Sequence, residues 1–398
     1  MSPQVAHSPQ GREAAAQRGE AERSVGPRGG GKASEGHRVW AIAGGGTGGH
    51  VTPALALAEA IAARGEVPFL LGGEFGLERR LVPEAGFELV TLPSGQLMGR
   101  GAAAQIHAVF ATLRGALVAR RELGNRRASV LISVGGYASV PGVIAAALRR
   151  IPIALVEPNA MPGRANRLAA RFARGVFVQF EAAAGALRRS GGVSVVGAPL
   201  RQALVAAFRS ALPRRAPGKP LRLLVFGGSQ GARQINDAMI EAAPRLDRTG
   251  FEIFHQTGEA DRERVAAAYA AAGITAEVVV FERDMPARYA ASDLALCRSG
   301  ALTVAELAMA GLPALFVPYP HAADDHQSAN ARAAAEAGAA IVLPSRPLAA
   351  GDLLRALADL AARPEQLVAM GAAASRLARP DAAERIVAAC GDWSSARS

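Results

Sequence analysis

Short apolar runs alternate with amphipathic, alanine-rich stretches along the chain from residue 38 onward. The runs have the length and residue types of strands, and most stretches between them have helical periodicity. Strands are expected at 38–43, 67–71, 87–91, 129–134, 152–156, 175–179 and 193–196, and again at 221–226, 251–256, 276–281, 293–297, 314–317 and 340–343. This alternation predicts an α/β fold in which helices cover both faces of a parallel sheet.

A polar, proline-rich stretch at 211–220, "ALPRRAPGKP", interrupts the alternation and indicates a domain boundary. The link could equally lie a little earlier, around Pro199, since "GAPLRQAL" also ends a strand. The chain is therefore expected to form two doubly wound, Rossmann-like domains, at 37–200 and 201–378, which face each other across a cleft. Residues 1–36 mix charged residues with Gly, Pro and Ser and contain almost nothing apolar, so a disordered tail is expected there.

Composition narrows the classes of partner. The formal net charge is +11, carried mostly by arginine, and it suits an anionic partner such as a phosphorylated ligand or an anionic bilayer surface. Nucleic acid is not expected, because only 5% of the residues are aromatic and no binding motif occurs. Cys297 and Cys390 lie among apolar residues and are predicted to be buried free thiols.

The glycine-rich stretch 44–50, "GGGTGGH", follows a predicted strand and opens a predicted helix. Glycines there let backbone N–H groups approach an oxyanion beside a helix N-terminus. Gly44, Gly46 and Gly49 satisfy the dinucleotide fingerprint G-x-G-x-x-G, and Glu74 stands where a ribose-binding acid is expected. Taken alone, the motif fits a purely structural turn equally well.

A second loop of the same design, "LLVFGGSQGARQIN" at 223–236, opens the second domain, and a third glycine-rich turn, "SVGGYASVPG", follows the fourth strand. A dehydrogenase needs one such loop. Two loops that face each other across a cleft suit a donor and an acceptor that both carry phosphates. The pair therefore favours group transfer over hydride transfer.

The segment 297–313, "CRSGALTVAELAMAGLP", reads as strand end, tight turn, helix and stop. Ser299 or Thr303 can cap the helix, and Glu306 follows Thr303 in capping-box spacing. Backbone N–H groups are then available to a diphosphate at Ala301, Leu302 and Thr303, with Glu306 placed to bond sugar hydroxyls. A plain capped helix is an equally supported alternative.

Six segments resemble, in order and spacing, the MurG family of bacterial N-acetylglucosamine transferases: "AGGGTGGHVTPALALA", "SVGGYASVPG", "VEPNAMPGRANRLAA", "VGAPLR", "VFGGSQGARQIN" and "CRSGALTVAELAMAGLPALFVPYPHAADDHQSANA". The resemblance implies a GT-B fold whose last helix, here 379–392, packs back on the first domain. It implies an inverting enzyme of peptidoglycan synthesis that moves GlcNAc from UDP-GlcNAc to the 4-hydroxyl of the MurNAc in lipid I, forming lipid II.

The same resemblance implies a peripheral protein at the cytoplasmic face of the inner membrane, with cell-wall and division proteins as conceivable partners. Carried over residue by residue, the donor site comprises Thr47, Gly48, Gly49, Asn159, Arg201, Ser229, Ala301, Leu302, Thr303, Glu306 and Gln327. Glu306 is expected to hold the ribose, and Gln327, with His326 beside it, the GlcNAc hydroxyls. Glu282 departs from the family, which often has an apolar residue where backbone atoms meet the uracil.

His50 is the candidate base, since a helix N-terminus favours the neutral imidazole that a base requires. Glu157 is the competing candidate, and a helix-start hydrogen bond or a contact with the acceptor diphosphate is the alternative role for His50. UDP departure is expected to be stabilised by helix N-terminal amides, the 227–229 loop and Arg201. No metal or other cofactor is required if these groups supply the charge.

The stretch 321–327, "HAADDHQ", contains two His and two Asp residues. Carboxylates so close in sequence usually mark a helix start, where Asp324 or Asp325 could cap. We therefore expect a capped helix that presents Gln327 to the sugar, in preference to a metal site.

Two stretches are candidates for membrane docking. Residues 94–123 combine Leu97, Met98, Ile106, Val109 and Phe110 with Arg100, Arg114, Arg120 and Arg121, and residues 163–175 add Arg164, Arg167, Arg171 and Arg174. An ordinary amphipathic helix packed on the sheet is the alternative. No membrane span is expected, because the apolar stretch 299–320 contains Glu306 and three prolines.

Three other functions stay open at this stage. A GT-B UDP-sugar transferase with a different lipid or small-molecule acceptor would share the nucleotide-binding half. A dinucleotide-binding oxidoreductase would share the first glycine loop. A non-catalytic sensor would bind UDP-GlcNAc without turning it over.

Overall fold

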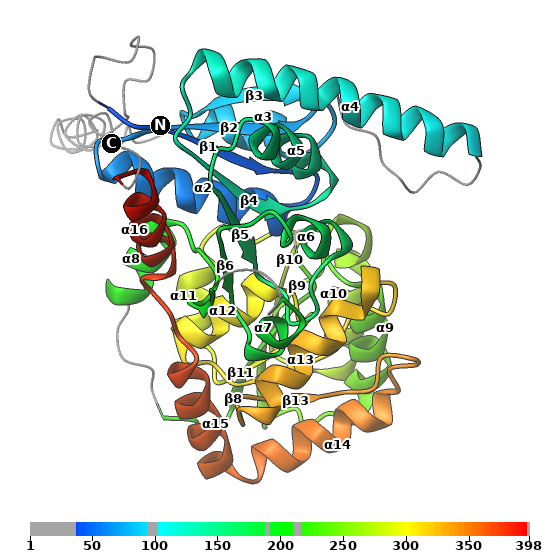
Figure 1. Ribbon diagram of the computed structural model, residues 1–398. Helices are drawn as coiled ribbons and strands as arrows, with labels where there is room; N and C mark the ends of the chain where they lie inside the picture. Colours follow the sequence, from blue (N-terminus) through cyan, green and yellow to red (C-terminus); the bar gives the residue numbers. More distant parts are fainter. Residues whose placement is uncertain (1–36, 94–101, 188–191, 211–215, 229, 396–398) are drawn as a thin grey trace, which may run out of the picture.

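The computed structural model describes residues 37–93, 102–187, 192–210, 216–228 and 230–395, with the backbone alone for 102–105 and 394–395. These residues form two parallel sheets with helices around each, one above the other in Figure 1. The expected tail 1–36, the start of the first docking stretch at 94–101, and Ser229 lie outside the described residues. The predicted α/β class, with two parallel sheets, is confirmed.

The first sheet has the strand order β3-β2-β1-β4-β5-β6-β7. Its strands are β1 (Val39–Gly44), β2 (Val67–Gly73), β3 (Glu88–Leu92), β4 (Val130–Gly135), β5 (Ile153–Glu157), β6 (Gly175–Val178) and β7 (Val193–Val195). Its helices are α2 (Gly48–Ala63), α3 (Glu78–Glu84), α4 (Ala102–Asn125), η2 (Tyr137–Ser139), α5 (Val140–Leu148), α6 (Arg164–Ala169) and α7 (Glu181–Leu187). All of the strand pairs are parallel.

The second sheet has the order β10-β9-β8-β11-β12-β13 and is also parallel. Its strands are β8 (Leu221–Phe226), β9 (Phe251–Gln256), β10 (Ala276–Val279), β11 (Leu294–Cys297), β12 (Ala314–Phe316) and β13 (Ala340–Val342). Around it lie α9 (Arg233–Ala242), η3 (Ala243–Arg245), η4 (Glu259–Asp261), α10 (Arg262–Ala272), α11 (Met285–Ala291), α12 (Ala301–Ala310), η5 (Ala323–Asp325), α13 (His326–Glu336), α14 (Ala350–Ala361) and α15 (Pro364–Arg376).

Every predicted strand forms, with its ends displaced by two residues at most. The sequence signal was strong because helices cover both faces of each sheet, so that central strands are mostly apolar. β4 and β5 are buried at every position, and β1 at all but its first residue. Cys297 and Cys390 are buried free thiols, as predicted.

The strand order reverses between β1 and β4 in the first sheet and between β8 and β11 in the second. Open parallel sheets bind ligands outside the carboxyl ends of the strands at such switch points. The loops that leave β1, β4, β8 and β11 include all the glycine-rich stretches noted in the sequence, so topology brings them to the two switch points.

Two further helices connect the halves. α8 (Gln202–Ser210) contacts α2 on one side and α11 and α12 on the other. The last helix, α16 (Ala382–Ser395), returns to the first domain and packs against α2, as Figure 1 shows at its left edge. Ile386, Val387 and Cys390 of α16 are fully buried in the core that includes Trp40 of β1. Among the described residues, no helix is long and apolar enough to cross a membrane.

Candidate active site

The two domains meet at the carboxyl ends of their strands, and hydrogen bonds cross between them there. Gln179, after β6, donates from Nε2 to the carbonyl of Ala301 at the start of α12 (3.1 Å). The backbone N–H of Ala160, after β5, donates to Oδ1 of Asn330 on α13 (2.8 Å). The turn that begins α12 therefore contacts the first domain directly.

His50 lies in the first turn of α2, where Thr47 is the N-cap residue. Its Nδ1 is 3.0 Å from Thr47 Oγ1, which leaves Nε2 for a substrate. The turn after β4 closes against it: a Cβ at Gly136 would lie 2.8 Å from the Gly45 carbonyl and 3.4 Å from His50 Nδ1. The sequence "GG" after β4 thus reflects close packing against the first loop.

Burial lowers the pKa of His50 below its ordinary value, and the Coulombic effect of His326 in the second domain lowers it further, while Glu78 opposes both. The imidazole is consequently neutral near pH 7, the protonation state a base needs. His326, at the start of α13, therefore lies close enough to His50, at the start of α2, to change its pKa.

The acid that holds the first loop is Glu78, whereas the ribose-binding role expected of Glu74 stays a prediction. Glu74 is exposed and follows the end of β2. Glu78 is 1% exposed and accepts hydrogen bonds from the backbone N–H groups of Gly46 (2.8 Å) and Gly73 (3.0 Å). A carboxylate that already occupies a loop amide disfavours a dinucleotide phosphate there by charge repulsion. In the sequence, Glu78 is one of several acids near α3. Only the folded structure shows that its carboxylate bonds to the loop amides.

Glu157 closes β5 and is 2% exposed, with both carboxylate oxygens occupied by the protein. One oxygen accepts from the backbone N–H and the side chain of Asn159, and the other from Gly163 N–H and Asn166 Nδ2, at 2.8–3.1 Å. Burial raises the pKa of Glu157, and these hydrogen bonds oppose the rise. Its carboxylate organises the 157–166 loop.

Asn159 and Asn330 meet across the domains. Asn330 is fully buried, and its Nδ2 donates to Asn159 Oδ1 (3.2 Å) and to the carbonyl of Ser299 (3.1 Å). Sequence reasoning missed Asn330, although an uncharged polar residue on the apolar side of a helix was a usable signal. It links the loop after β5, the turn after β11 and α13.

The predicted capping box at α12 is wrong. Gly300 is the N-cap residue and no side chain caps the helix, so the first-turn amides of Ala301, Leu302 and Thr303 remain available to an anion. Ser299 instead donates to the Gln327 carbonyl (2.8 Å), which joins the starts of α12 and α13.

Glu306, one turn into α12, accepts a hydrogen bond from the hydroxyl of Tyr289 (2.8 Å). Burial raises the pKa of Glu306 to about 7, and the Tyr289 bond opposes the rise. The Tyr289 ring is held between Phe208 and Phe226, so the hydroxyl that orients the carboxylate is itself fixed.

Gln327 lies in the first turn of α13, and its Oε1 accepts from the Tyr319 N–H (2.9 Å). The expected cap by Asp324 or Asp325 is wrong: Asp325 is the N-cap residue but forms no capping bond, and it accepts from the Ser328 hydroxyl instead. Asp324 faces the first domain and pairs with Arg164 (3.4 Å) and Arg167 (3.6 Å). Asp324 therefore connects the two domains and Asp325 bonds within its own helix, so neither caps α13.

Arg201 forms an ion pair with Glu59 of α2, and Glu59 also accepts from the Gln202 N–H. Glu59 lies roughly 14 Å along α2 from His50. Arg201 is thus held by a carboxylate of the first domain, and its expected contact with the diphosphate near the α12 turn stays a prediction. The cation beside that turn is Arg298, at the end of β11, which sequence reasoning missed.

Arg298 is half-buried and donates from Nη1 to Gln234 Oε1 and to the carbonyls of Val317 and Pro318. Burial lowers the pKa of Arg298. Within the described part of the chain it has no carboxylate partner, so its charge is available to an anion at the cleft.

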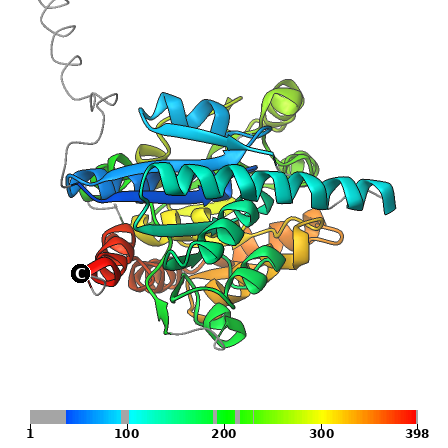
Figure 2. The same cartoon turned by 45° about the horizontal axis from the view of Figure 1, so that its top comes forward.

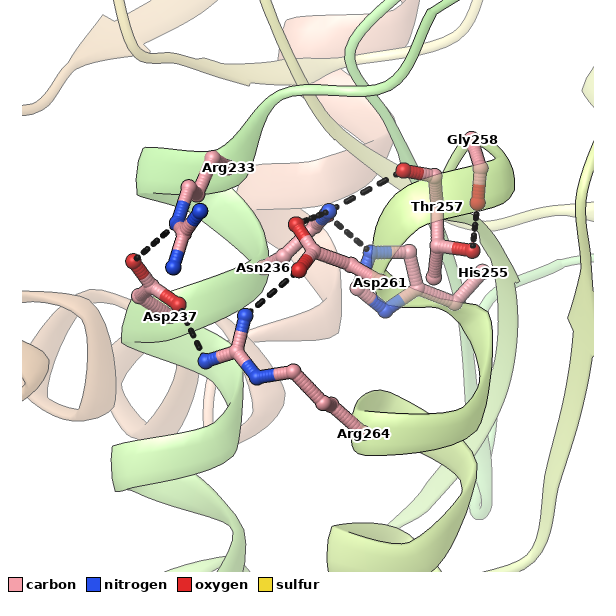
Figure 3. A network of polar contacts seen from close by, with 8 residues as sticks. All are labelled: Arg233, Asn236, Asp237, His255, Thr257, Gly258, Asp261 and Arg264. Atoms are coloured by element: carbon pink, nitrogen blue, oxygen red, sulfur yellow. Dashed lines mark hydrogen bonds and ion pairs between the residues drawn. The ribbon is translucent and has the colours of Figure 1, made fainter.

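The second glycine loop is supported by a buried polar network, drawn in Figure 3. Asn236 donates to the Thr257 carbonyl (3.0 Å) and to Asp261 (2.9 Å), and its Oδ1 lies 3.0 Å from Nε2 of His255. Burial lowers the pKa of His255 to about 3, so this histidine is neutral and structural. A side chain at Gly231 would overlap the backbone at Thr257, which explains the glycine.

Glu282 is turned back on its own loop. Its carboxylate accepts from Arg288 (2.7 Å) and from the Asp284 N–H (2.8 Å), and these bonds lower its pKa. Its backbone N–H donates to Gln256 (3.0 Å). The acidic side chain is therefore bonded within its own loop, and it does not displace the loop backbone, whose N–H bonds Gln256.

No three His, Cys, Asp or Glu side chains come together in metal-binding geometry within the described ranges. The "HAADDHQ" segment places its two aspartates on different partners, as given above. The segment leads into α13, which begins at His326.

Known proteins resemble the chain over nearly its whole folded length. The family models of the glycosyltransferase family 28 N-terminal and C-terminal domains match residues 40–178 and 222–386. UDP-N-acetylglucosamine–N-acetylmuramyl-(pentapeptide) pyrophosphoryl-undecaprenol N-acetylglucosamine transferases of Aeromonas hydrophila and Azotobacter vinelandii are 42% and 43% identical. The alignments cover 87% and 88% of this chain and 94% and 97% of those proteins.

Solved structures agree. The crystal structure of MurG from Acinetobacter baumannii has a TM-score of 0.76 at 32% identity, covering 89% of this chain and 99% of that one. The calicheamicin glycosyltransferase CalG4 has a TM-score of 0.63 at 17% identity, covering 89% and 98%, and shares the fold.

Two Rossmann-like sheets with glycine-rich loops at both switch points define a GT-B fold. The chain belongs to glycosyltransferase family 28, and the resemblance to the MurG family is confirmed. The oxidoreductase alternative is not favoured.

Asn330→Ala should lower the free energy of unfolding by about 2–4 kcal/mol, because it leaves buried groups of both domains without partners. Urea unfolding measures the change. Ser328→Ala, on the same helix, loses one exposed hydrogen bond and should change stability by less than about 0.5 kcal/mol. Equal effects of the two substitutions would contradict the linking role of Asn330.

Proposed function

We propose that this protein transfers GlcNAc from UDP-GlcNAc to the 4-hydroxyl of the MurNAc in lipid I, forming lipid II in peptidoglycan synthesis. The observation that carries the proposal is the contact between the domains around three helix starts: α12 and α13 bond to the first domain, and His326 at the start of α13 acts electrostatically on His50 at the start of α2. The names of relatives that are 42–43% identical support the same substrates.

The first domain supplies the base. His50 Nε2 takes the proton of the acceptor 4-hydroxyl as that oxygen attacks the anomeric carbon of GlcNAc. A new C–O bond forms while the bond from the anomeric carbon to UDP breaks, and attack opposite the leaving group inverts the configuration. We assign the base to His50 rather than Glu157, because four protein hydrogen bonds already occupy the Glu157 carboxylate.

The second domain holds the donor. The uncapped amides at the start of α12 and the Arg298 guanidinium stabilise the diphosphate as negative charge develops on it. Glu306 accepts from the ribose hydroxyls, and Gln327 bonds the GlcNAc hydroxyls. Because amides and arginine supply the charge, the proposed reaction needs no divalent metal.

His50→Gln should reduce kcat by about 10²–10⁴-fold, since a neutral amide cannot accept the proton. The assay incubates purified protein with radiolabelled UDP-GlcNAc and a soluble lipid I analogue, with and without chelator, and measures the labelled disaccharide. Calorimetry should show unchanged UDP affinity, because the donor site lies on the other domain. Near-normal turnover by the variant would remove His50 as the base.

Donor binding should weaken as pH falls through about 7, where Glu306 gains a proton and loses an acceptor for the ribose. Tyr289→Phe removes the hydroxyl that stabilises the carboxylate, so it raises the pKa of Glu306 and moves this transition to higher pH. Calorimetric titration with UDP between pH 5.5 and 8.5 measures it. Glu306→Gln, which cannot ionise, should bind UDP weakly at every pH, and a persisting transition would assign it elsewhere.

We further propose that the first domain docks on an anionic bilayer. α4 extends beyond the sheet in Figures 1 and 2 and carries exposed apolar side chains on one face. These are Ile106, Val109, Phe110, Leu113 and Leu117. A groove of about 180 Å³ between α5 and α6 continues the apolar surface, with Leu148, Leu168 and Phe172 exposed beside it.

The basic flank is smaller than the sequence suggested, because Arg164 and Arg167 pair with Asp324 and Arg174 lies over the Trp393 ring. Leu97, Met98 and Arg100 fall outside the described residues. Contacts with cell-wall and division proteins stay a prediction.

Phe110→Asp should reduce binding to anionic vesicles by about tenfold or more, because it places a charge on the apolar face of α4. Vesicle co-sedimentation at low and high salt measures binding, and turnover of a soluble acceptor analogue should be unchanged. Equal binding of the unaltered protein to neutral vesicles at high salt would contradict docking on anionic lipid.

A further inference from the structure

Beneath the first glycine-rich loop lies the buried carboxylate of Glu78, which no step of the proposed mechanism uses. We propose that Glu78 is a positioning residue for the transfer: it fixes the turn that presents His50, and its negative charge stabilises the imidazolium that His50 becomes. The inference rests on the proposed function, in which His50 is the base.

The two oxygens of Glu78 accept hydrogen bonds from the backbone of two separate segments. Oε2 accepts from the Gly46 N–H and Oε1 from the Gly73 N–H, so the end of β2 and the loop after β1 are tied to one carboxylate. Gly46 has φ of +91°, and the next residue, Thr47, begins α2. Fixing the Gly46 amide therefore fixes the entry into the helix that carries His50.

Glycines make the room for this carboxylate. A Cβ at Gly45 or at Gly76 would overlap the carboxylate itself, and one at Gly72 would lie 2.8 Å from Cγ of Glu78. These three positions come from the loop after β1, from β2 and from the turn before α3. Glycines from three segments of the chain thus leave a space free of other side chains, and the Glu78 side chain fills it.

A buried carboxylate without a cation is costly, which makes its retention informative. No Lys or Arg in the described part of the chain forms an ion pair with Glu78. Two backbone N–H bonds offset part of the desolvation. A neutral glutamine would span the same distance, but its NH₂ group would face one of the backbone N–H donors.

The charge of Glu78 acts on His50 through space, since Thr47 occupies the Nδ1 side of the ring. Two ionisable groups influence His50: Glu78 from α3 raises its pKa, and His326 from α13 lowers it. The 135–139 turn that packs on the ring carries Tyr137 and no charged side chain. Glu78 is therefore the anion that accompanies His50 when it gains the acceptor proton.

Glu78→Gln tests the inference through the pH profile of kcat, measured with radiolabelled UDP-GlcNAc and a soluble lipid I analogue. Loss of the charge lowers the pKa of His50, so the acid limb should move to lower pH by roughly one unit. The plateau should fall about ten- to hundredfold, because the base is weaker and its loop less fixed. KM for UDP-GlcNAc should change less than kcat, since the groups proposed to hold the diphosphate, ribose and GlcNAc at α12 and α13 lie on the second domain.

Two variants separate charge from geometry, and the second also serves if Glu78→Gln does not fold. Glu78→Asp keeps the charge but cannot reach both amides, so kcat should fall while the acid limb stays near its position in the unaltered protein. Gly45→Ala displaces the carboxylate from its space without removing it, and should shift the acid limb downward. Glu88→Gln, which loses an exposed carboxylate bonded to Arg126, should leave the profile unchanged.

The outcomes distinguish the two levels of the argument. If the unaltered protein forms no labelled disaccharide, or His50→Gln turns over normally, the proposed function or its base fails. If His50→Gln is inactive while folded Glu78→Gln and Gly45→Ala keep the kcat and pH profile of the unaltered protein, the inference about Glu78 fails alone. An acid limb that moves to higher pH would overturn it as well.

Discussion

The amide of Asn330 lies where the two sheets meet, with no exposed surface, and every hydrogen bond it makes joins separate parts of the chain. It reaches Asn159 and Ala160 in the first domain and Ser299 in the second. The base and the donor amides belong to different domains, so they act on one substrate pair only while this contact sets the distance between them. Each such bond contributes about 0.5–1.5 kcal/mol net, which is small enough for the cleft to open and admit substrate.

Three carboxylates line the same region without a cationic partner, and each is satisfied differently. Glu78 and Glu157 accept from backbone and amide groups, and Glu306 accepts from the Tyr289 hydroxyl. Removal from water raises the pKa of Glu157 and of Glu306. The net positive charge of the chain is therefore carried by residues outside the region that holds these three carboxylates. A diphosphate would be held there by helix N-terminal amides and by Arg298.

The glycine loops illustrate why a motif can be recognised before its cause is known. At the first loop, glycine makes room for the Glu78 carboxylate and for the turn after β4. At the second loop, Gly231 makes room for the backbone at Thr257, which the His255 and Asn236 network supports from behind. Both loops fit the pattern of a phosphate-binding turn, yet the absence of a Cβ serves internal packing on one side of each. The first loop alone could therefore not distinguish hydride transfer from group transfer.

The sequence by itself determined the strands, the parallel class and the location of the glycine-rich turns, because strands buried on both faces must be apolar and switch-point loops follow them directly. The motifs in the sequence also identified His50, Glu306 and Gln327 as candidate site residues. The tertiary structure alone decided the partners of acids and amides: Glu78 at the first loop, Asn330 between the domains, Arg201 on Glu59, and Asp324 on Arg164 and Arg167. These pairings join residues many positions apart, and local periodicity contains no information about which side chains the fold brings into hydrogen-bonding distance.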